Sequence, residues 1–376
     1  MKIGIDASRA FLKQRTGIEE YSYQVIKHLV EPRHCLGSTE VVLYLRKNQN
    51  IDFKLPEKWK IKTVKFPYLW TQLGLSLELL FHPIDVLFVP AHVVPIVHPK
   101  NTIVTMHGLE YEFFPEGYSL LERLYMRASI KMSCRWAKKI IAVSKNTKKD
   151  LMELYKVPEK KVEVIYEGVN INQKSLPEAD QPLAENFNDQ ILNYKPYLLF
   201  IGRLEKRKNI EGIIEAYKIL KEKYKIPHSL VLAGAPGYGY EIIKLKIQNY
   251  LKIKNSKLKI IELGYISEEK KQELMRSADV FLFPTFYEGF GLPILEAQSL
   301  GVPVVTSNVS SLPEVGGESV FYADPYESEI IADTVFKLIS DQKTKDDIIK
   351  RGYENIKRFS WEKCAEEIAN NFIKKQ

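Results

Sequence analysis

Two glutamates flank a glycine-rich segment in the second half of the chain, and seven residues separate them: Glu288 and Glu296. The residues after Glu288 are Gly289, Phe290, Gly291, Leu292 and Pro293. Glycine lets a backbone approach a ligand closely, and proline suits the first turn of a helix, whose amide groups attract anions. We therefore expect the amides of Phe290 to Leu292 to face a phosphate. Glu296, one turn into the helix, could accept both hydroxyls of a ribose, and Glu288 could hold the hydroxyls of a sugar.

A second set of candidates follows an earlier strand. The apolar run Tyr197–Ile201 ends at Gly202, and Arg203 and Lys208 lie in the loop before the next amphipathic segment. Arginine binds phosphate oxygens through its planar fork, and lysine acts as a mobile point charge. Two such cations at the carboxyl end of a strand could neutralise a diphosphate. An ordinary basic loop has the same composition, so both interpretations stay open on these residues alone.

Short β-branched runs alternate with longer amphipathic runs along most of the chain. The expected buried strands are 2–6, 41–45, 86–89, 103–106, 140–143 and 162–165, then 197–201, 230–233, 259–262, 280–283, 302–306 and 320–322. Strands separated by helices form parallel sheets, so the sequence predicts two α/β domains with doubly wound parallel sheets. We expect the first domain over residues 1–172, a polar linker over 173–194 and the second domain over 195–359. An amphipathic segment within 360–376 could pack back on the first domain.

The composition is that of a soluble globular protein. Of the 376 residues, 45% are hydrophobic and 27% are charged, which excludes a disordered or fibrous chain. Cys35, Cys134 and Cys364 form no CxxC pair and have no histidine cluster beside them, so we expect a reducing compartment and no structural zinc site. The chain opens on an expected strand rather than a leader, and its apolar runs are short. These features predict a cytoplasmic protein without a membrane-spanning segment.

Positive charge is concentrated in one segment of the chain. The net charge is +8, and the segment from Arg123 to Lys161 contains twelve lysines and arginines and three acidic residues. Such a stripe could attract phosphate, the anionic inner face of a cell membrane or nucleic acid, or it could be a solvated helix face. We do not expect nucleic acid as a partner because no stacking aromatic series and no RNA-binding or helix-turn-helix signature accompanies the charge.

The first domain offers weaker candidates. Gly17 stands at the start of an expected helix, where backbone amides could reach a phosphate, and His107 follows the expected strand 103–106. A lone histidine is more often structural than chemical, so both interpretations of His107 stay open. The leucine-rich segment Trp70–Phe81 could dock a lipid-linked acceptor, although a buried helix accounts for it better.

The segment from Glu288 to Glu296 resembles the E-x7-E motif of the retaining family-4 glycosyltransferases (glycosyl transferases group 1), which have the two-domain GT-B fold. The similarity continues in order through residues 197–325. It includes Gly202-Arg203-Leu204, Arg207-Lys208-Asn209, Leu230–Gly234, Leu263-Gly264-Tyr265, Ala278-Asp279-Val280, Gly301–Val305 and Leu312–Val315. The resemblance implies two Rossmann-like domains that face a central cleft, with an activated sugar bound between them.

The same resemblance implies roles for the candidates of the second domain. Arg203 and Lys208, beside Gly202, would bind the diphosphate of a nucleotide-sugar and stabilise it as it leaves. Glu288 would contact the donor sugar and Glu296 would hold the ribose. The backbone from Gly289 through Phe290 and Gly291 to Leu292 would close over sugar and phosphate, and the segment ending at Ile266 would lie near the base.

In the first domain, the resemblance implies that Gly17 belongs to a glycine loop of the donor site and that His107 bonds the donor sugar. Thr16-Gly17-Ile18 is similar to a mannosyltransferase-like subset, which favours GDP-mannose as donor. Two positions depart from the family pattern. Gly108 replaces the aspartate that often follows the histidine, so a carboxylate support for His107 is in doubt. Glu167 replaces a usual asparagine and is expected to be structural.

These observations together predict a retaining hexosyltransferase whose acceptor is a glycan or a lipid-linked saccharide. The chain contains no Asp-x-Asp pair, so Arg203, Lys208 and helix amides would hold the diphosphate, and neither a metal nor another cofactor is expected. Alternatives are a UDP-glucose or UDP-GlcNAc transferase, a sucrose-type synthase or phosphorylase, and a non-catalytic nucleotide-sugar or glycan-binding protein. A hydride-transfer enzyme is disfavoured because Gly234–Gly239 follows a mid-domain strand.

Overall fold

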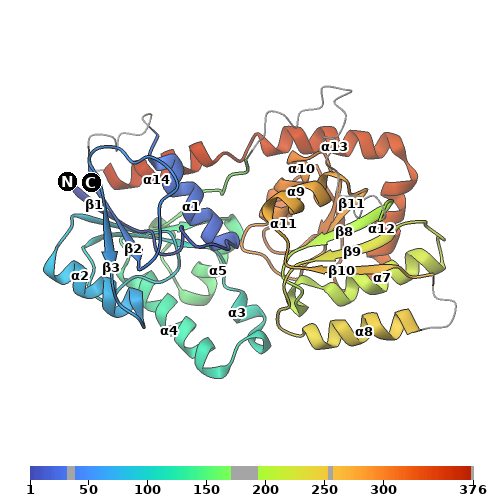
Figure 1. Ribbon diagram of the computed structural model, residues 1–376, viewed down its shortest axis with the longest axis horizontal. Coiled ribbons are helices and arrows are strands. Elements are labelled where there is room, and N and C mark those ends of the chain that lie inside the picture. The colour runs from blue at the N-terminus through green and yellow to red at the C-terminus, as the bar shows by residue number, and fades with distance from the viewer. Residues whose placement is uncertain (32–38, 171–193, 253–256, 374–376) are drawn as a thin grey trace. The chain divides into compact units, whose positions relative to one another are not determined.

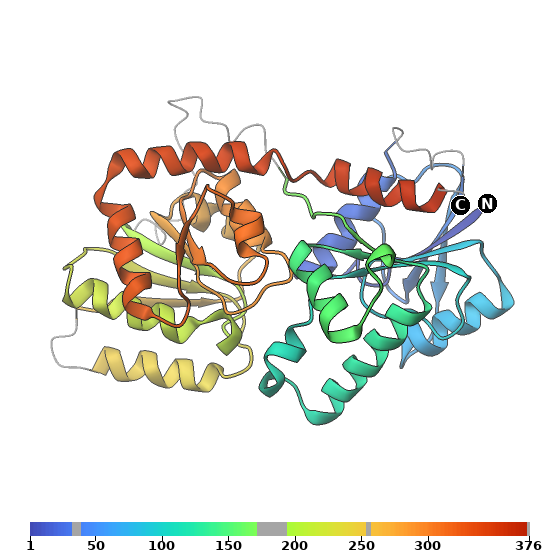
Figure 2. The same ribbon diagram turned by 180° about the vertical axis from the view of Figure 1, so that it is seen from behind.

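The computed structural model describes residues 1–31, 39–170, 194–252 and 257–373. The chain divides into two compact units: Met1–Gly168 together with the segment from Phe359 onward, and Val169–Arg358. Each unit contains one parallel sheet with helices on both of its faces, as Figures 1 and 2 show. The expected linker lies outside the described residues except for Tyr194, and Cys35 lies outside them as well.

The first unit is built on a seven-stranded sheet in the order β3-β2-β1-β4-β5-β6-β7. Its strands are β1 (Lys2–Asp6), β2 (Glu40–Arg46), β3 (Trp59–Val64), β4 (Val86–Val89), β5 (Asn101–Met106), β6 (Lys139–Ala142) and β7 (Val162–Val164). Its α-helices are α1 (Gly17–Leu29), α2 (Ser76–Phe81), α3 (Glu110–Phe113), α4 (Leu120–Trp136), α5 (Lys145–Tyr155) and α14 (Trp361–Ile373). The sequence did not predict β3, because lysines alternate through it, a pattern typical of an edge strand.

The second unit has six parallel strands in the order β10-β9-β8-β11-β12-β13. They are β8 (Tyr197–Ile201), β9 (Ser229–Ala233), β10 (Ile260–Gly264), β11 (Val280–Phe283), β12 (Val304–Ser307) and β13 (Phe321–Ala323). The helices are α7 (Ile210–Glu222), α8 (Tyr240–Lys252), α9 (Glu268–Arg276), α10 (Leu292–Ser299), α11 (Leu312–Gly316), α12 (Ser328–Ser340) and α13 (Gln342–Ile356). Every residue of β8, β9, β11 and β12 is buried, which explains the continuous apolar sequences of β8 and β11.

Both sheets are doubly wound. In each, the first strand of the unit lies beside the fourth, β1 beside β4 and β8 beside β11, and the chain runs outward in opposite directions on either side of that pair. Ligands of such sheets bind outside the carboxyl ends of the strands at this switch point. The loops after β8 and β11 are therefore where the fold itself predicts a site in the second unit.

The C-terminal helix α14 packs against α1 in the first unit. The ring of Trp361 lies edge-on to Tyr21 at 6.0 Å between centroids, and Phe372 lies 5.6 Å from Phe88. Gly168 allows the returning chain to pass closely, since a Cβ at this position would lie 2.1 Å from the backbone nitrogen of Trp361. The amphipathic pattern of this segment thus serves the core of the first unit.

The segment Trp70–Phe81 is not the continuous buried helix that the sequence favoured. A π-helical turn, η2 (Trp70–Leu75), leads into α2. Trp70 is buried, whereas Leu80 and Phe81 are 58% and 72% exposed. One side of the segment belongs to the core and the other faces solvent, because six-residue helical pieces at the edge of a sheet bury only one stripe.

Candidate active site

The loop after β8 is fixed by the side chain of one asparagine. Lys208 ends a one-turn 3-10 helix, η6 (Lys206–Lys208), and Asn209 follows in the left-handed conformation, with φ of 58°, as the N-cap of α7. Asn209 Nδ2 donates to the carbonyl oxygens of Pro284 at 3.0 Å and Pro325 at 2.7 Å, and its Oδ1 accepts from the Gly212 amide at 3.2 Å. A single buried side chain therefore ties together the loops after β8, β11 and β13.

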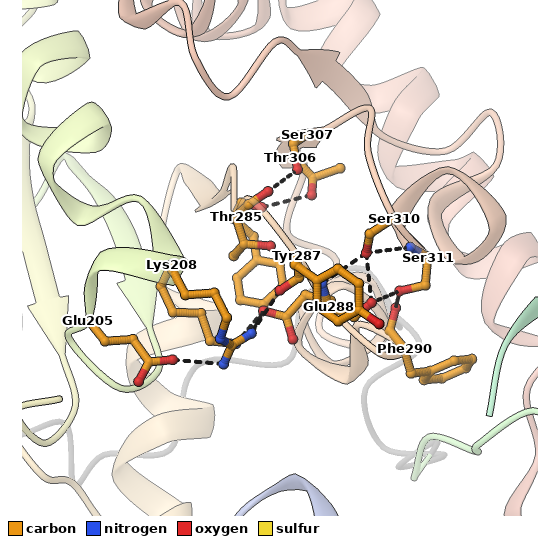
Figure 3. A network of polar contacts seen from close by, with 12 residues as sticks. Glu205, Lys208, Thr285, Tyr287, Glu288, Phe290, Thr306, Ser307, Ser310 and Ser311 are labelled. Atoms are coloured by element: carbon orange, nitrogen blue, oxygen red, sulfur yellow. Dashed lines mark hydrogen bonds and ion pairs between the residues drawn. The ribbon is translucent and has the colours of Figure 1, made fainter. Parts of the chain in front are cut away.

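Opposite charges from the loops after β8 and β11 meet at the switch point. Lys208 Nζ is ion-paired with Glu288 Oε1, and Arg207 Nη1 lies 3.3 Å from the same oxygen (Figure 3). Arg207 also donates to the carbonyl of Tyr287 and to Glu205 Oε1, both at 2.7 Å. The side chains of Lys208 and Glu288 are only 12% and 13% exposed. Burial raises the pKa of Glu288, but the Lys208 and Arg207 cations outweigh it and hold this pKa below its usual range.

Two serines after β12 hold the glycine-rich turn by its carbonyl groups. Ser310 Oγ accepts from the Glu288 amide at 2.9 Å and donates to the Glu288 carbonyl at 2.7 Å. Ser311 Oγ donates to the carbonyls of Glu288 and Phe290 at 2.9 and 2.6 Å (Figure 3). In a trans peptide the N–H of the next residue points away from the carbonyl. The N–H groups of Gly289 and Gly291 are therefore directed to the side opposite these serines, immediately before α10.

Gly291 has a φ of 121° and is the N-cap of α10, which starts at Leu292 with Pro293 in its first turn. A side chain at Gly291 would be strained in this conformation, and its Cβ would lie 2.9 Å from the Leu312 side chain. The sequence prediction of a glycine turn followed by a proline-initiated helix agrees with this geometry. A helix start of this kind is a general anion site.

The backbones of three neighbouring strand ends approach one another closely. Gly202, Gly234 and Gly264 follow or end β8, β9 and β10, and their φ values are 153°, 149° and 64°. The Gly202 amide donates to Ala233 O at 3.0 Å and the Gly234 amide to Gly264 O at 2.7 Å. A Cβ at Gly234 would lie 1.8 Å from the Gly202 carbonyl oxygen. Because these bonds fix Gly202, they also fix the direction in which the chain enters Arg203.

Arg203 is exposed, and its aliphatic part lies over Gly237, where a Cβ would come within 2.7 Å of Arg203 Cγ. Arg203 and Lys208 therefore both lie in the loop that follows β8, and the side chain of Arg203 is accessible to solvent. Ile266 follows β10 and is partly buried.

Glu296 on α10 forms an ion pair with Lys271 of α9 at 2.9 Å, and Lys271 also binds Glu268 at 2.9 Å. Burial disfavours the charged form of Lys271, but the two carboxylates outweigh this effect and raise its pKa above the usual range. Glu296, the residue expected to bind the ribose, is therefore held in place by Lys271, which the sequence did not single out.

The structure brings most of the predicted residues of the second unit to one edge of one sheet. Lys208 and Glu288 are in direct contact, and Gly289 to Leu292 follow at once. Gly17 and His107 belong to the first unit. There Gly17 begins α1, and the ring of Tyr21 on that helix lies edge-on to His107 at 4.5 Å.

Sequence reasoning missed several residues that shape the site. The missed residues are Glu205, Arg207, Asn209, Lys271, Ser310 and Ser311. Arg207 and Asn209 lie in a segment that resembles the family, so the resemblance could have identified them as site residues. Ser310, whose φ is 56°, gave no such signal, because only the pairing of β11 with β12 brings it to the glycine-rich turn.

The arrangement can bind an anionic group through cations and helix amides. The ionised carboxylate of Glu288 lies beside these cations. Among the described residues, no three histidine, cysteine, aspartate or glutamate side chains come together in a way that could hold a metal ion. Two doubly wound sheets, with a cationic site at the switch point of the second, define a protein of the GT-B architecture.

Comparison with known proteins then identifies the family. Residues 184–355 match the model of the glycosyl transferases group 1, and residues 15–173 match that of glycosyltransferase family 4. The O-antigen chain mannosyltransferase B of Escherichia coli is 31% identical over 273 residues, 73% of this chain and 70% of that protein. The chain belongs to this family of glycosyltransferases, and the predicted family is confirmed.

Solved structures show the same fold at lower sequence identity. WaaG, a glycosyltransferase involved in lipopolysaccharide biosynthesis, superimposes with a TM-score of 0.72 at 15% identity, over 100% of both chains. HepE of Anabaena, solved in complex with UDP and glucose, gives a TM-score of 0.71 at 18% identity, over 99% of this chain and 98% of that one. The predicted GT-B fold class is thereby confirmed.

Proposed function

We propose that this glycosyltransferase transfers mannose from GDP-mannose to a glycan or lipid-linked saccharide of a surface polysaccharide, with retention at the anomeric carbon and without a metal ion. The contact between Lys208 and Glu288 at the switch point carries the proposal, because it joins a cation to the carboxylate that we expect to bind the sugar. The donor and the pathway are supported by the similarity to an O-antigen mannosyltransferase and by the Thr16-Gly17-Ile18 segment.

In this proposal the difficult step is departure of the nucleoside diphosphate. The bond from the anomeric carbon to the phosphate oxygen breaks, and its electron pair goes to the diphosphate. Arg203, Lys208 and the amides of Gly289 to Leu292 stabilise that charge, since preorganised donors act strongly in a partly dehydrated site. Glu288 would bind the donor sugar and Glu296 the ribose, with Ile266 near the base. The acceptor hydroxyl adds on the same face of the sugar and gives its proton to the leaving phosphate oxygen.

An assay across sugar donors tests this proposal. Purified full-length protein is incubated with GDP-mannose, UDP-glucose, UDP-GlcNAc or ADP-glucose in the presence of EDTA, and the released nucleoside diphosphate is measured. We expect turnover with GDP-mannose that EDTA leaves unchanged and, when a saccharide acceptor is added, an α-linked product by NMR. Turnover that only a divalent cation supports would overturn the metal-independent mechanism, because the cations and amides above would then be insufficient.

A UDP-sugar transferase is the second candidate, favoured by the fold similarity to a protein solved with UDP and glucose. Turnover with a UDP-sugar alone would select it. Tight binding of one donor without hydrolysis or transfer to any saccharide acceptor would instead indicate a non-catalytic binding protein.

We further propose that the first unit docks on the anionic inner face of a cell membrane through α4, which overlaps the basic segment Arg123–Lys161 from Arg123 to Trp136. Four large apolar side chains of its first two turns are at least half exposed: Leu120, Leu121, Leu124 and Tyr125. At 100° per residue, Lys131 and Arg135 share this exposed arc in the later turns. An apolar tip beside cations fits an anionic bilayer. No described helix is long and apolar enough to cross a membrane.

Vesicle co-sedimentation tests the α4 surface. The Leu121→Ser/Leu124→Ser variant should bind vesicles of phosphatidylcholine and phosphatidylglycerol more than about tenfold more weakly, because apolar area is withdrawn from the lipid. High salt should also weaken binding. The matched control is Leu77→Ser/Leu80→Ser on α2, whose exposed leucines have no cation in the last turn. An equal loss in this control, or equal binding to neutral vesicles, would contradict docking through α4.

A further inference from the structure

A buried polar cluster lies at the carboxyl edge of the first sheet. His107 follows β5, and Glu167 comes three residues after β7. His107 Nδ1 lies 3.3 Å from Glu167 Oε1, and His107 Nε2 lies 2.8 Å from the carbonyl oxygen of Pro90, after β4. The two side chains are only 7% and 5% exposed. The imidazole is thus held at both nitrogens by groups from two other strand ends.

Both ring nitrogens face hydrogen-bond acceptors, which determines where the hydrogens lie. The Pro90 carbonyl can only accept, so Nε2 carries a hydrogen. A carboxylate beside Nδ1 forms a hydrogen bond only if one of the two groups is protonated. Imidazole is ordinarily the stronger base of the two. The geometry therefore requires a hydrogen between Nδ1 and Glu167 Oε1, and we expect it on Nδ1, with an imidazolium facing a carboxylate.

The neighbouring titratable groups leave this pair intact. His92 Nε2 accepts a hydrogen bond from the His107 backbone N–H at 2.9 Å. Burial lowers the pKa of His92 to about 3, with smaller contributions from His107 and Arg9, so His92 is neutral near pH 7. Burial also raises the pKa of Tyr21 and of Cys364, each with a contribution from Glu167. These two groups are therefore uncharged near neutral pH and add no competing charge.

We propose that Glu167 is a positioning residue that orients His107 toward the donor sugar. The inference rests on the proposed function and on the role that the family resemblance implies for His107, a hydrogen bond to the donor sugar. Gly108 has a φ of 147°, a conformation that residues with side chains rarely adopt, so the residue after His107 does not provide a carboxylate in this backbone. Glu167 supplies the carboxylate instead, from the segment that follows β7. Nε2 then exchanges the Pro90 carbonyl for a sugar hydroxyl, while Nδ1 stays bound to Glu167.

NMR of protein labelled with 15N-histidine tests the pair without any activity assay. The His107 signals are assigned by their loss in His107→Gln. We expect hydrogens on both ring nitrogens in the wild-type protein near neutral pH. In Glu167→Gln the amide donates to Nδ1, so Nδ1 loses its hydrogen and its signal moves to that of a neutral ring. Identical His107 spectra in both proteins would overturn the pairing.

Kinetics test the positioning role. Glu167→Gln should lower kcat/KM for the donor about 10- to 100-fold, by analogy with the loss of the carboxylate partner of a metal-ligating histidine, and should change its pH profile. Glu167→Asp should recover part of the loss. The control Glu163→Gln, on β7 and paired with Lys139 at 2.9 Å, should keep wild-type values. Unchanged kinetics in Glu167→Gln, with the NMR change present, overturn the role; a wild-type protein inactive with every donor overturns the proposed function instead.

Discussion

Replacing Lys208 with methionine should lower kcat/KM for the sugar donor about 100- to 1,000-fold, the typical cost of removing one preorganised donor that stabilises a developing negative charge. Lys208 is the largely buried cation at the switch point, in contact with Glu288 and 5.1 Å from the centre of the Phe283 ring. Methionine keeps the apolar stem but removes the charge. Donor turnover under saturating and limiting donor concentrations measures the effect.

The Lys208→Met protein should stay folded. Glu288 keeps Arg207 at 3.3 Å, so the carboxylate is not left as an isolated buried charge, whose cost would be about 3–5 kcal/mol. The matched control is Lys206→Met, in the same 3-10 turn but exposed, which should retain activity and melting temperature. A Lys208→Met enzyme with wild-type turnover would contradict the assignment of the diphosphate to this loop.

The alternation of apolar and amphipathic runs predicted every strand of the two sheets except β3. Buried parallel strands such as β8 and β11 have almost no polar residues, and glycine or proline marks the turns that follow them. β3 was not predicted, because the four central residues of this edge strand are exposed or partly exposed and include two lysines, which leaves no continuous apolar run. Segment boundaries differed by one or two residues, as at β12, where Pro303 precedes the first ladder residue, Val304.

The sequence identified residues of the site but not which of them contact one another. Lys208 and Glu288 are 80 positions apart, and only the pairing of β8 with β11 brings their loops together. Periodicity carries no information on strand order, so the sequence presented both residues as ligands and gave no sign that they bind each other. The same applies to Lys271 and Glu296, which meet across α9 and α10.

The first unit shows how two departures from a family pattern can be related in space. From the sequence alone, Gly108 indicates a missing carboxylate and Glu167 is expected to be structural, with nothing to connect the two. The fold places the Glu167 carboxylate against His107 because β5 and β7 lie on either side of β6. His107 and Glu167 are 60 positions apart, and without the strand order the sequence gives no reason to connect them.

Replacing Gly234 with alanine should destabilise the second unit by more than about 3 kcal/mol, because two independent penalties combine: a side chain at φ of 149°, and a Cβ 1.8 Å from the Gly202 carbonyl oxygen. The contact is with backbone, which cannot rotate away as a side chain can. Relief requires β8 and β9 to separate at their carboxyl ends, which displaces Arg203. We therefore expect donor turnover to fall together with stability.

Gly264→Ala is the matched control, since Gly264 ends the next strand and also has positive φ, 64°, but its Cβ would meet nothing within 4 Å. This variant should lose only about 1–2 kcal/mol, the cost of a left-handed alanine. Hydrogen–deuterium exchange locates the damage: Gly234→Ala should lose protection in β8 and β9. All four tryptophans, Trp59, Trp70, Trp136 and Trp361, belong to the first unit, so their fluorescence should stay native. Equal stability of the two alanine variants would show that the close approach of Gly234 to Gly202 does not constrain the fold, because strain at φ alone would then account for both.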